Sequence, residues 1–66
     1  MRTTRTAESV VLGYRVERVE EYDATGMLCA MRHDVLCPQT GAVLATLESL
    51  RAAERYVLAR ELGEAA

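Results

Sequence analysis

Three residues with metal-ligand chemistry stand four apart near the middle of the 66-residue chain: Cys29, His33 and Cys37. Thiolate and imidazole are ligands that zinc prefers, at metal distances of about 2.0–2.3 Å. In a helix the three side chains would share one face, whereas in a strand consecutive members lie about 13 Å apart, at about 3.3 Å per residue. We interpret the segment as a strand, because Gly26 precedes it and Pro38 ends it. No metal site is therefore expected, and a disulfide between the two cysteines is excluded because bridged Cα atoms lie within about 7 Å.

His33 is the single histidine of the chain. Its functional interpretation is a general acid, a general base or a pH-sensitive contact. The alternative, which we favour, is a core histidine whose ring bonds a hydroxyl such as that of Thr46 or Tyr56. Asp34 is adjacent in sequence but points to the opposite face of a strand, so the spacing supports no pair of nucleophile and base.

Two further patterns, a cluster of acidic residues and four isolated glycines, indicate structural roles and no catalytic or phosphate-binding site. Acidic residues cluster between Glu17 and Asp23, but strand alternation divides them between two faces and neighbouring arginines neutralise them. The four glycines, at positions 13, 26, 41 and 63, are isolated, so the chain lacks the Gly-rich loop that cradles phosphate. We therefore expect a non-catalytic protein with no catalytic residue and no cofactor. An enzyme of unknown class is the third alternative, after the two binding functions given below.

The elements that carry these residues are separated by two turn signals, Asp23–Gly26 and Pro38–Gly41, which both end in Thr-Gly. Alternating apolar residues predict strands at 10–22, 27–37 and 42–47. Ser49 is a suitable cap for a helix at 50–62, which Gly63 ends. The predicted fold class is α+β, a three-stranded antiparallel β-meander with one C-terminal α-helix packed on one face. The predicted domain spans 10–63, between a flexible N-terminal arm at 1–9 and a C-terminal tail at 64–66.

Charge predicts the pairing register of the first two strands. A four-residue loop at Asp23–Gly26 sets Glu17 opposite Arg32 and Arg15 opposite Asp34, two pairs worth about 0.2–1 kcal/mol each. In this register the face with the charged pairs is solvated. The other face is apolar and forms the predicted core under the helix, with Leu12, Tyr14, Val16, Met27, Cys29, Met31, Val35, Cys37, Ala42 and Leu44.

The chain has more apolar residues than one sheet face and one helix stripe can bury. A chain of this length buries only about 60% of its unfolded surface, and exposed apolar patches usually mark protein interfaces. The predicted interface residues are Val11, Leu36, Val43, Leu47, Leu58 and Leu62. We therefore expect a protein-interaction module that acts as a two-fold homodimer, or as an adaptor or inhibitor on a larger protein. Small phage or mobile-element proteins that block host enzymes are often of this size, and we expect a bacterial or phage protein.

The charge balance bears on other partners. A net charge of −2 argues against attachment to nucleic acid or to a membrane by bulk charge. The alternative function is a small sheet-type, sequence-tolerant DNA-binding module, because a three-stranded antiparallel sheet followed by a helix is the topology of modules whose exposed strand residues enter the major groove. Its contacts would come from Arg2, Arg5, Arg15 and Arg32. The chain shows no apolar run of membrane-spanning length and no secretory signal, and its two cysteines suit a reduced state, so we expect a cytoplasmic protein.

Overall fold

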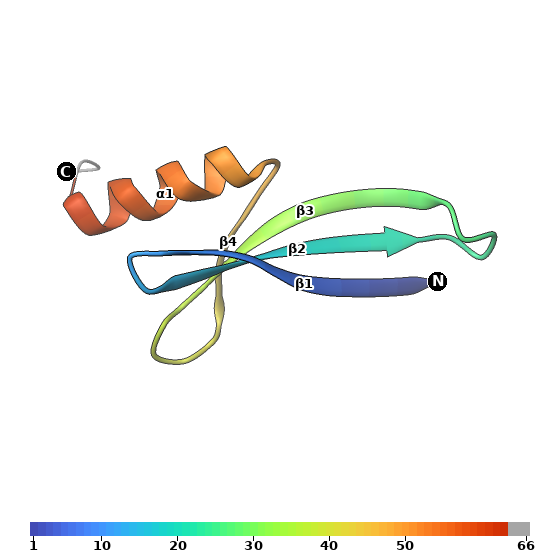
Figure 1. The fold of residues 1–66 in the computed structure, drawn as a ribbon, viewed down its shortest axis with the longest axis horizontal. Helices are drawn as coiled ribbons and strands as arrows, with labels where there is room; N and C mark the ends of the chain where they lie inside the picture. The colour runs from blue at the N-terminus through green and yellow to red at the C-terminus, as the bar shows by residue number, and fades with distance from the viewer. Residues whose placement is uncertain (64–66) are drawn as a thin grey trace.

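The computed structural model describes residues 1–63 and contains a four-stranded antiparallel sheet followed by one helix. The elements are β1 (Arg2–Val11), β2 (Tyr14–Tyr22), β3 (Leu28–Leu36), β4 (Val43–Leu47) and α1 (Leu50–Leu62). The strands lie in chain order across the sheet, β1-β2-β3-β4 (Figure 1). The predicted α+β class, the antiparallel meander and the C-terminal helix are confirmed, whereas the predicted number of three strands is wrong.

The fourth strand arises from a turn at Leu12 and Gly13, inside the segment predicted as one strand. Leu12 has a φ of 50° and Gly13 a φ of 88°. Positive φ at both central residues is typical of a type I′ turn, whose twist matches that of the two strands it joins. The chain therefore doubles back, and segment 1–9, expected as a flexible arm outside the domain, supplies most of β1. The predicted tail at 64–66 lies outside the described residues.

The pairing register predicted from charge is wrong by two residues. Glu17 lies opposite Asp34, and Arg15 lies opposite Leu36. The opposite charges meet elsewhere, because Asp34 is paired with arginines on β1 and on its own strand. Since the shift is even, the paired side chains of β2 and β3 from Arg15–Leu36 to Glu21–Ala30 stay on their predicted faces of the sheet. At Thr46 and Leu47 on β4 the faces are exchanged, because Thr46 bonds Asp34 and Leu47 packs against the core.

The core lies between α1 and the sheet, and its buried members are Tyr14, Val16, Val35, Ala53 and Val57. The predicted helix ends are confirmed. The Ser49 hydroxyl accepts a hydrogen bond from the Ala52 N–H at 3.0 Å, and Gly63 takes the left-handed conformation that ends the helix.

The helix covers only one end of the sheet. Its 13 residues span about 20 Å, whereas the molecule is 44 Å long. The N-terminal half of β1 and the β2–β3 hairpin extend beyond it (Figure 1). Met27, Cys29 and Met31 lie beyond the helix and are exposed, as is Leu12 at the β1–β2 turn, and Cys37 is half-buried. The prediction of these residues as core is wrong. A helix of this length does not reach Met27, Cys29 and Met31, whereas Leu12 lies in the β1–β2 turn and Cys37 lies in the loop after β3. Ala42, at the end of that loop, was also predicted as core and is exposed.

Candidate interaction surface

The sheet face opposite α1 carries an ion-pair network centred on Asp34. This carboxylate is only 1% exposed. It accepts hydrogen bonds from Arg5 Nη1 at 3.2 Å, from Arg32 Nε at 3.3 Å and from the Thr46 hydroxyl at 2.9 Å. The expectation that this face is solvated around its charged residues is therefore wrong at Asp34, which is a buried carboxylate with three donors.

Both arginines of the network have a second carboxylate partner. Glu17 lies 3.1 Å from Arg5, and Glu21 lies 2.7 Å from Arg32. Val19 stands opposite both arginines in the sheet and is fully buried, as expected where the aliphatic stems of arginine flank an apolar side chain. Each guanidinium is thus largely neutralised for contact with phosphate.

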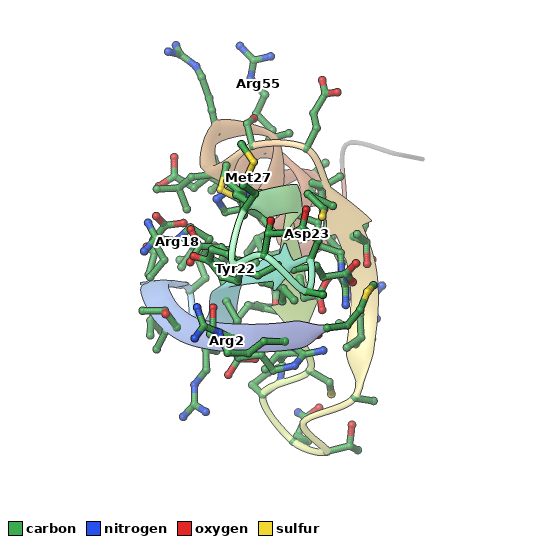
Figure 2. All side chains as sticks on the ribbon, turned by 90° about the vertical axis from the view of Figure 1, so that its right-hand side faces the viewer. Arg2, Arg18, Tyr22, Asp23, Met27 and Arg55 are labelled. Atoms are coloured by element: carbon green, nitrogen blue, oxygen red, sulfur yellow. The ribbon has the colours of Figure 1, made fainter. Side chains whose placement is uncertain are left out.

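The four arginines of the DNA-binding alternative do not form one cationic surface. Arg5 and Arg32 belong to the network. Arg2 lies over the ring of Tyr22, 4.8 Å from its centroid, at the uncovered end of the sheet (Figure 2). Arg15 lies at the opposite end of β2 and has no ion pair within residues 1–63.

His33 is a buried residue that joins three strands. It is 4% exposed, and its Nε2 lies 2.9 Å from Glu8 Oε1. Glu8 also accepts a hydrogen bond from Arg18 Nη1 at 3.3 Å. The predicted core position is confirmed, but the predicted hydroxyl partners, Thr46 and Tyr56, are wrong. The true partner is on β1, where a β-bulge at Glu8 aims the carboxylate across the sheet.

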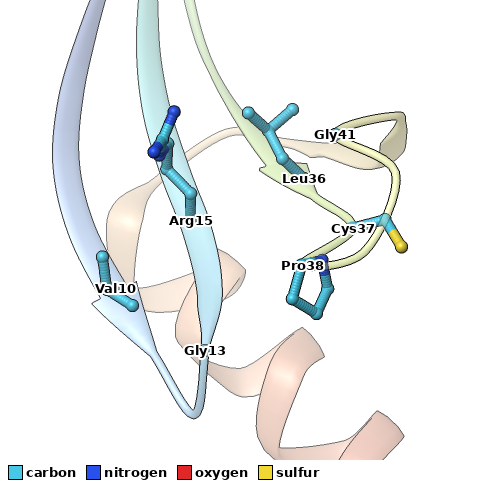
Figure 3. A pocket seen from close by; sticks show the side chains of 7 residues that line it. All are labelled: Val10, Gly13, Arg15, Leu36, Cys37, Pro38 and Gly41. Carbon is cyan, nitrogen blue, oxygen red and sulfur yellow. The ribbon is translucent and has the colours of Figure 1, made fainter.

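A hollow of about 270 Å³ lies on the face opposite α1, at the covered end of the sheet. It is lined by Val10, Gly13, Arg15, Leu36, Cys37, Pro38 and Gly41 (Figure 3). Val10, Arg15, Leu36 and Val43 form one row across all four strands. The row points away from the core, because its neighbours along β2 and β3 are the core residues Tyr14, Val16 and Val35. We name this hollow and its row the Arg15 hollow.

The loop at the edge of the Arg15 hollow stabilises a thiolate. Hydrogen bonds from the Thr40 hydroxyl, then from the N–H groups of Thr40 and Gln39, lower the pKa of Cys37. The Cys37 sulfur points away from Arg15 in Figure 3. The thiol and the guanidinium therefore do not converge on one point in the hollow.

The six predicted interface residues lie in different environments. Val11 and Leu47 pack against the core, and Leu36 lines the Arg15 hollow. The other three are exposed: Val43 by 48%, Leu58 by 40% and Leu62 by 68%. The structure thus brings Leu36 and Val43 together on the sheet, and leaves Leu58 and Leu62 on the helix.

A second exposed apolar surface was not predicted from the sequence. It consists of five consecutive uncharged residues, Met27–Met31, which we name the hairpin segment. All five are exposed, with Met27 at 69%, Leu28 at 52% and Met31 at 47%. The outer edge of β3 is open here, because β4 pairs only with His33–Leu36. The predicted strand lengths already indicated this open edge. The strand predicted at 42–47 has six residues and cannot pair along the whole edge of the strand predicted at 27–37, which has eleven.

No cofactor or metal chemistry is assigned to these surfaces. Within residues 1–63, no three side chains of His, Cys, Asp and Glu are placed to hold a metal ion together. In the same range no helix is both long and apolar enough to cross a membrane. Comparison with protein-family models, with curated proteins and with solved structures finds no match for the chain.

Proposed function

We propose that the protein is a small non-catalytic protein-interaction module that acts as a homodimer. One observation carries the proposal: among residues 1–63, more large apolar side chains are exposed than are buried. The buried apolar residues are Tyr14, Val16, Val19, Val35, Ala53 and Val57. The large apolar residues that are at least 40% exposed are Met1, Val10, Leu12, Met27, Leu28, Met31, Val43, Leu58 and Leu62.

One exposed apolar side chain is not enough to hold two proteins together, because the free energy gained by burying it is smaller than the cost of association. Burying one Val, Leu or Met side chain completely contributes roughly 1.5–3 kcal/mol. Association of two proteins costs about 4–15 kcal/mol in lost translational and rotational freedom. An interface therefore needs several neighbouring apolar side chains from each partner, which the Arg15 hollow, the hairpin segment and the outer side of α1 could each supply. Docking on a larger protein as an adaptor or inhibitor uses the same surfaces.

The DNA-binding alternative has weaker support. Contacts with phosphate need several cations without carboxylate partners, and Arg5 and Arg32 each have two such partners. Arg2 and Arg15 are the residues of that alternative that have no carboxylate partner within residues 1–63. Binding to duplex DNA that weakens with salt and disappears when Arg15 and Arg32 are both replaced by Ala would favour the alternative.

Light scattering coupled to size exclusion tests the homodimer. We expect a mass of twice the 7.3 kDa of one chain at protein concentrations up to about 100 μM, a range in which weak biological dimers form. A mass of one chain throughout that range would contradict the homodimer. The proposal would then reduce to docking on a different protein.

A further inference from the structure

We propose that the second copy of the chain binds at the hairpin segment, with the two copies related by a two-fold axis near Cys29. This inference rests on the proposed homodimer and names its surface. Figure 2 looks onto this end of the molecule, where Met27 lies beside the turn that contains Asp23. The end lies beyond α1, so neither the helix nor β4 shields it.

The side chains of the hairpin segment are of the kind usually found on a buried strand, although the segment is exposed. Its five side chains are apolar or small and carry no charge. Natural proteins protect open sheet edges with charged residues, bulges or proline. The other long edge, β1, has such protection, with Arg2, Arg5 and a bulge at Glu8. The open part of β3 has only one such device, a bulge at Cys29 opposite Glu21 and Tyr22, and it has no charge before Arg32.

Self-contact distinguishes the hairpin segment from the other exposed apolar surfaces. In a two-fold dimer each surface meets the same surface of the other copy. The Arg15 hollow would bring Arg15, which has no carboxylate partner within residues 1–63, towards its own symmetry mate. Like charges at the centre of an interface oppose association. The outer side of α1 carries Arg51, Glu54 and Arg55 beside Leu58, so a self-contact there would have to remove charged side chains from water.

The hairpin segment meets its mate without this penalty. It has no charge of its own and lies between the turn at Asp23 and Arg32. The Arg32 guanidinium is already paired with Glu21 and Asp34 of its own chain, so it adds no unpaired positive charge to a contact between two copies of the segment. Cys29 is the middle residue of the five, so it lies nearest the axis, and its thiol is free and exposed.

Oxidative cross-linking tests this geometry directly. A disulfide forms only where the two Cα atoms come within about 7 Å. Cys37→Ser leaves Cys29 as the single thiol, and Cys29→Ser leaves Cys37 as the matched control. Proximity in a formed dimer raises the effective thiol concentration to the millimolar range. Protein at about 100 μM with diamide as oxidant should therefore cross-link at least about tenfold faster through Cys29 than the same variant does when unfolded in urea.

The Cys29→Ser control should give far less cross-linked dimer than the Cys37→Ser variant when both are folded, although folding lowers the pKa of Cys37. Equal rates for the folded and unfolded Cys37→Ser protein would overturn the proposed axis. Faster cross-linking through Cys37 than through Cys29 would overturn it as well, because it would place the loop beside the Arg15 hollow at the interface.

A pair of charge substitutions separates the inference from the proposed function. Leu28→Glu introduces a charge in the hairpin segment and should convert the dimer to a monomer, whereas Leu62→Glu, on α1, should leave the dimer intact. Circular dichroism checks that both variants are folded. If the native chain is dimeric but Leu62→Glu and not Leu28→Glu dissociates it, the inference fails and the homodimer stands. A native chain that is monomeric refutes both.

Discussion

Replacement of Asp34 by Asn tests whether the buried network stabilises the sheet. Asp34 lies on β3 and is reached by Arg5 from β1, by Arg32 from its own strand and by Thr46 from β4. The amide has nearly the same volume as the carboxylate, so the substitution removes the charge with little change in packing. It also replaces one acceptor oxygen by an NH₂ donor, which cannot bond a guanidinium.

The expected loss follows from the hydrogen bonds that weaken. A hydrogen bond to a charged group contributes about 1.5–3 kcal/mol, and one between neutral groups about 0.5–1.5 kcal/mol. Two arginine contacts to Asp34 change from the first class to the second or disappear, so the free energy of unfolding should fall by about 2 kcal/mol. Removing a partner from a fully buried ion pair costs about 3–5 kcal/mol. The loss is smaller here because Glu17 and Glu21 still pair with the two arginines.

Urea unfolding followed by circular dichroism measures this loss, at one fixed protein concentration because dimerisation changes the apparent stability. We expect the thermal midpoint to fall by about 8–16 °C, at about 4–8 °C per kcal/mol for a domain of this size. Thr46→Val is the matched control, since it removes one hydroxyl donor and should cost about 1 kcal/mol. A loss below about 0.5 kcal/mol in Asp34→Asn would refute the argument, because it would equal the value of an exposed ion pair.

Three other substitutions test local features of the fold. Leu12→Asn should raise the free energy of unfolding by about 1 kcal/mol, because Asn tolerates the positive φ of 50° at this exposed position better than Leu; an unchanged urea midpoint would argue against strain there. Hydrogen bonds from the Thr25 hydroxyl and from nearby backbone N–H groups lower the pKa of Asp23 below its ordinary 3.8, so its stabilisation exists above that pH and is lost as the pH falls through the lower folded-state value. Asp23→Asn should therefore destabilise the protein at neutral pH and show a shrinking difference from the native chain in acid, and a difference that grows in acid would be inconsistent with this sign. Glu8→Ala leaves the buried His33 without its partner and should cost about 1–3 kcal/mol in urea unfolding, whereas Glu8→Gln, which retains an acceptor oxygen, should cost less.

Local patterns in the chain were sufficient for the secondary structure after the first turn. The cap at Ser49, the stop at Gly63 and the turn signals at Asp23–Gly26 and Pro38–Gly41 depend on residues within a few positions of one another. Strand alternation likewise placed Tyr14, Val16 and Val35 under the helix. The first hairpin was missed because Leu12 is an unusual residue at the first central position of a type I′ turn, where Asn or Gly is typical.

The candidate surfaces depend on contacts between residues far apart in the chain. Pairing of β1 with β2 brings Glu8 to His33 and Arg5 to Asp34, and without that strand no local pattern favours either partner. The register of β2 and β3 follows the sum of these contacts, whose individual cross-strand pairs are worth only about 0.2–1 kcal/mol and cannot specify it alone. The exposure of Met27–Met31 is set by where α1 ends on the sheet. Apolar alternation predicts which side of a strand is apolar, but whether that side is covered depends on the length and position of a distant helix.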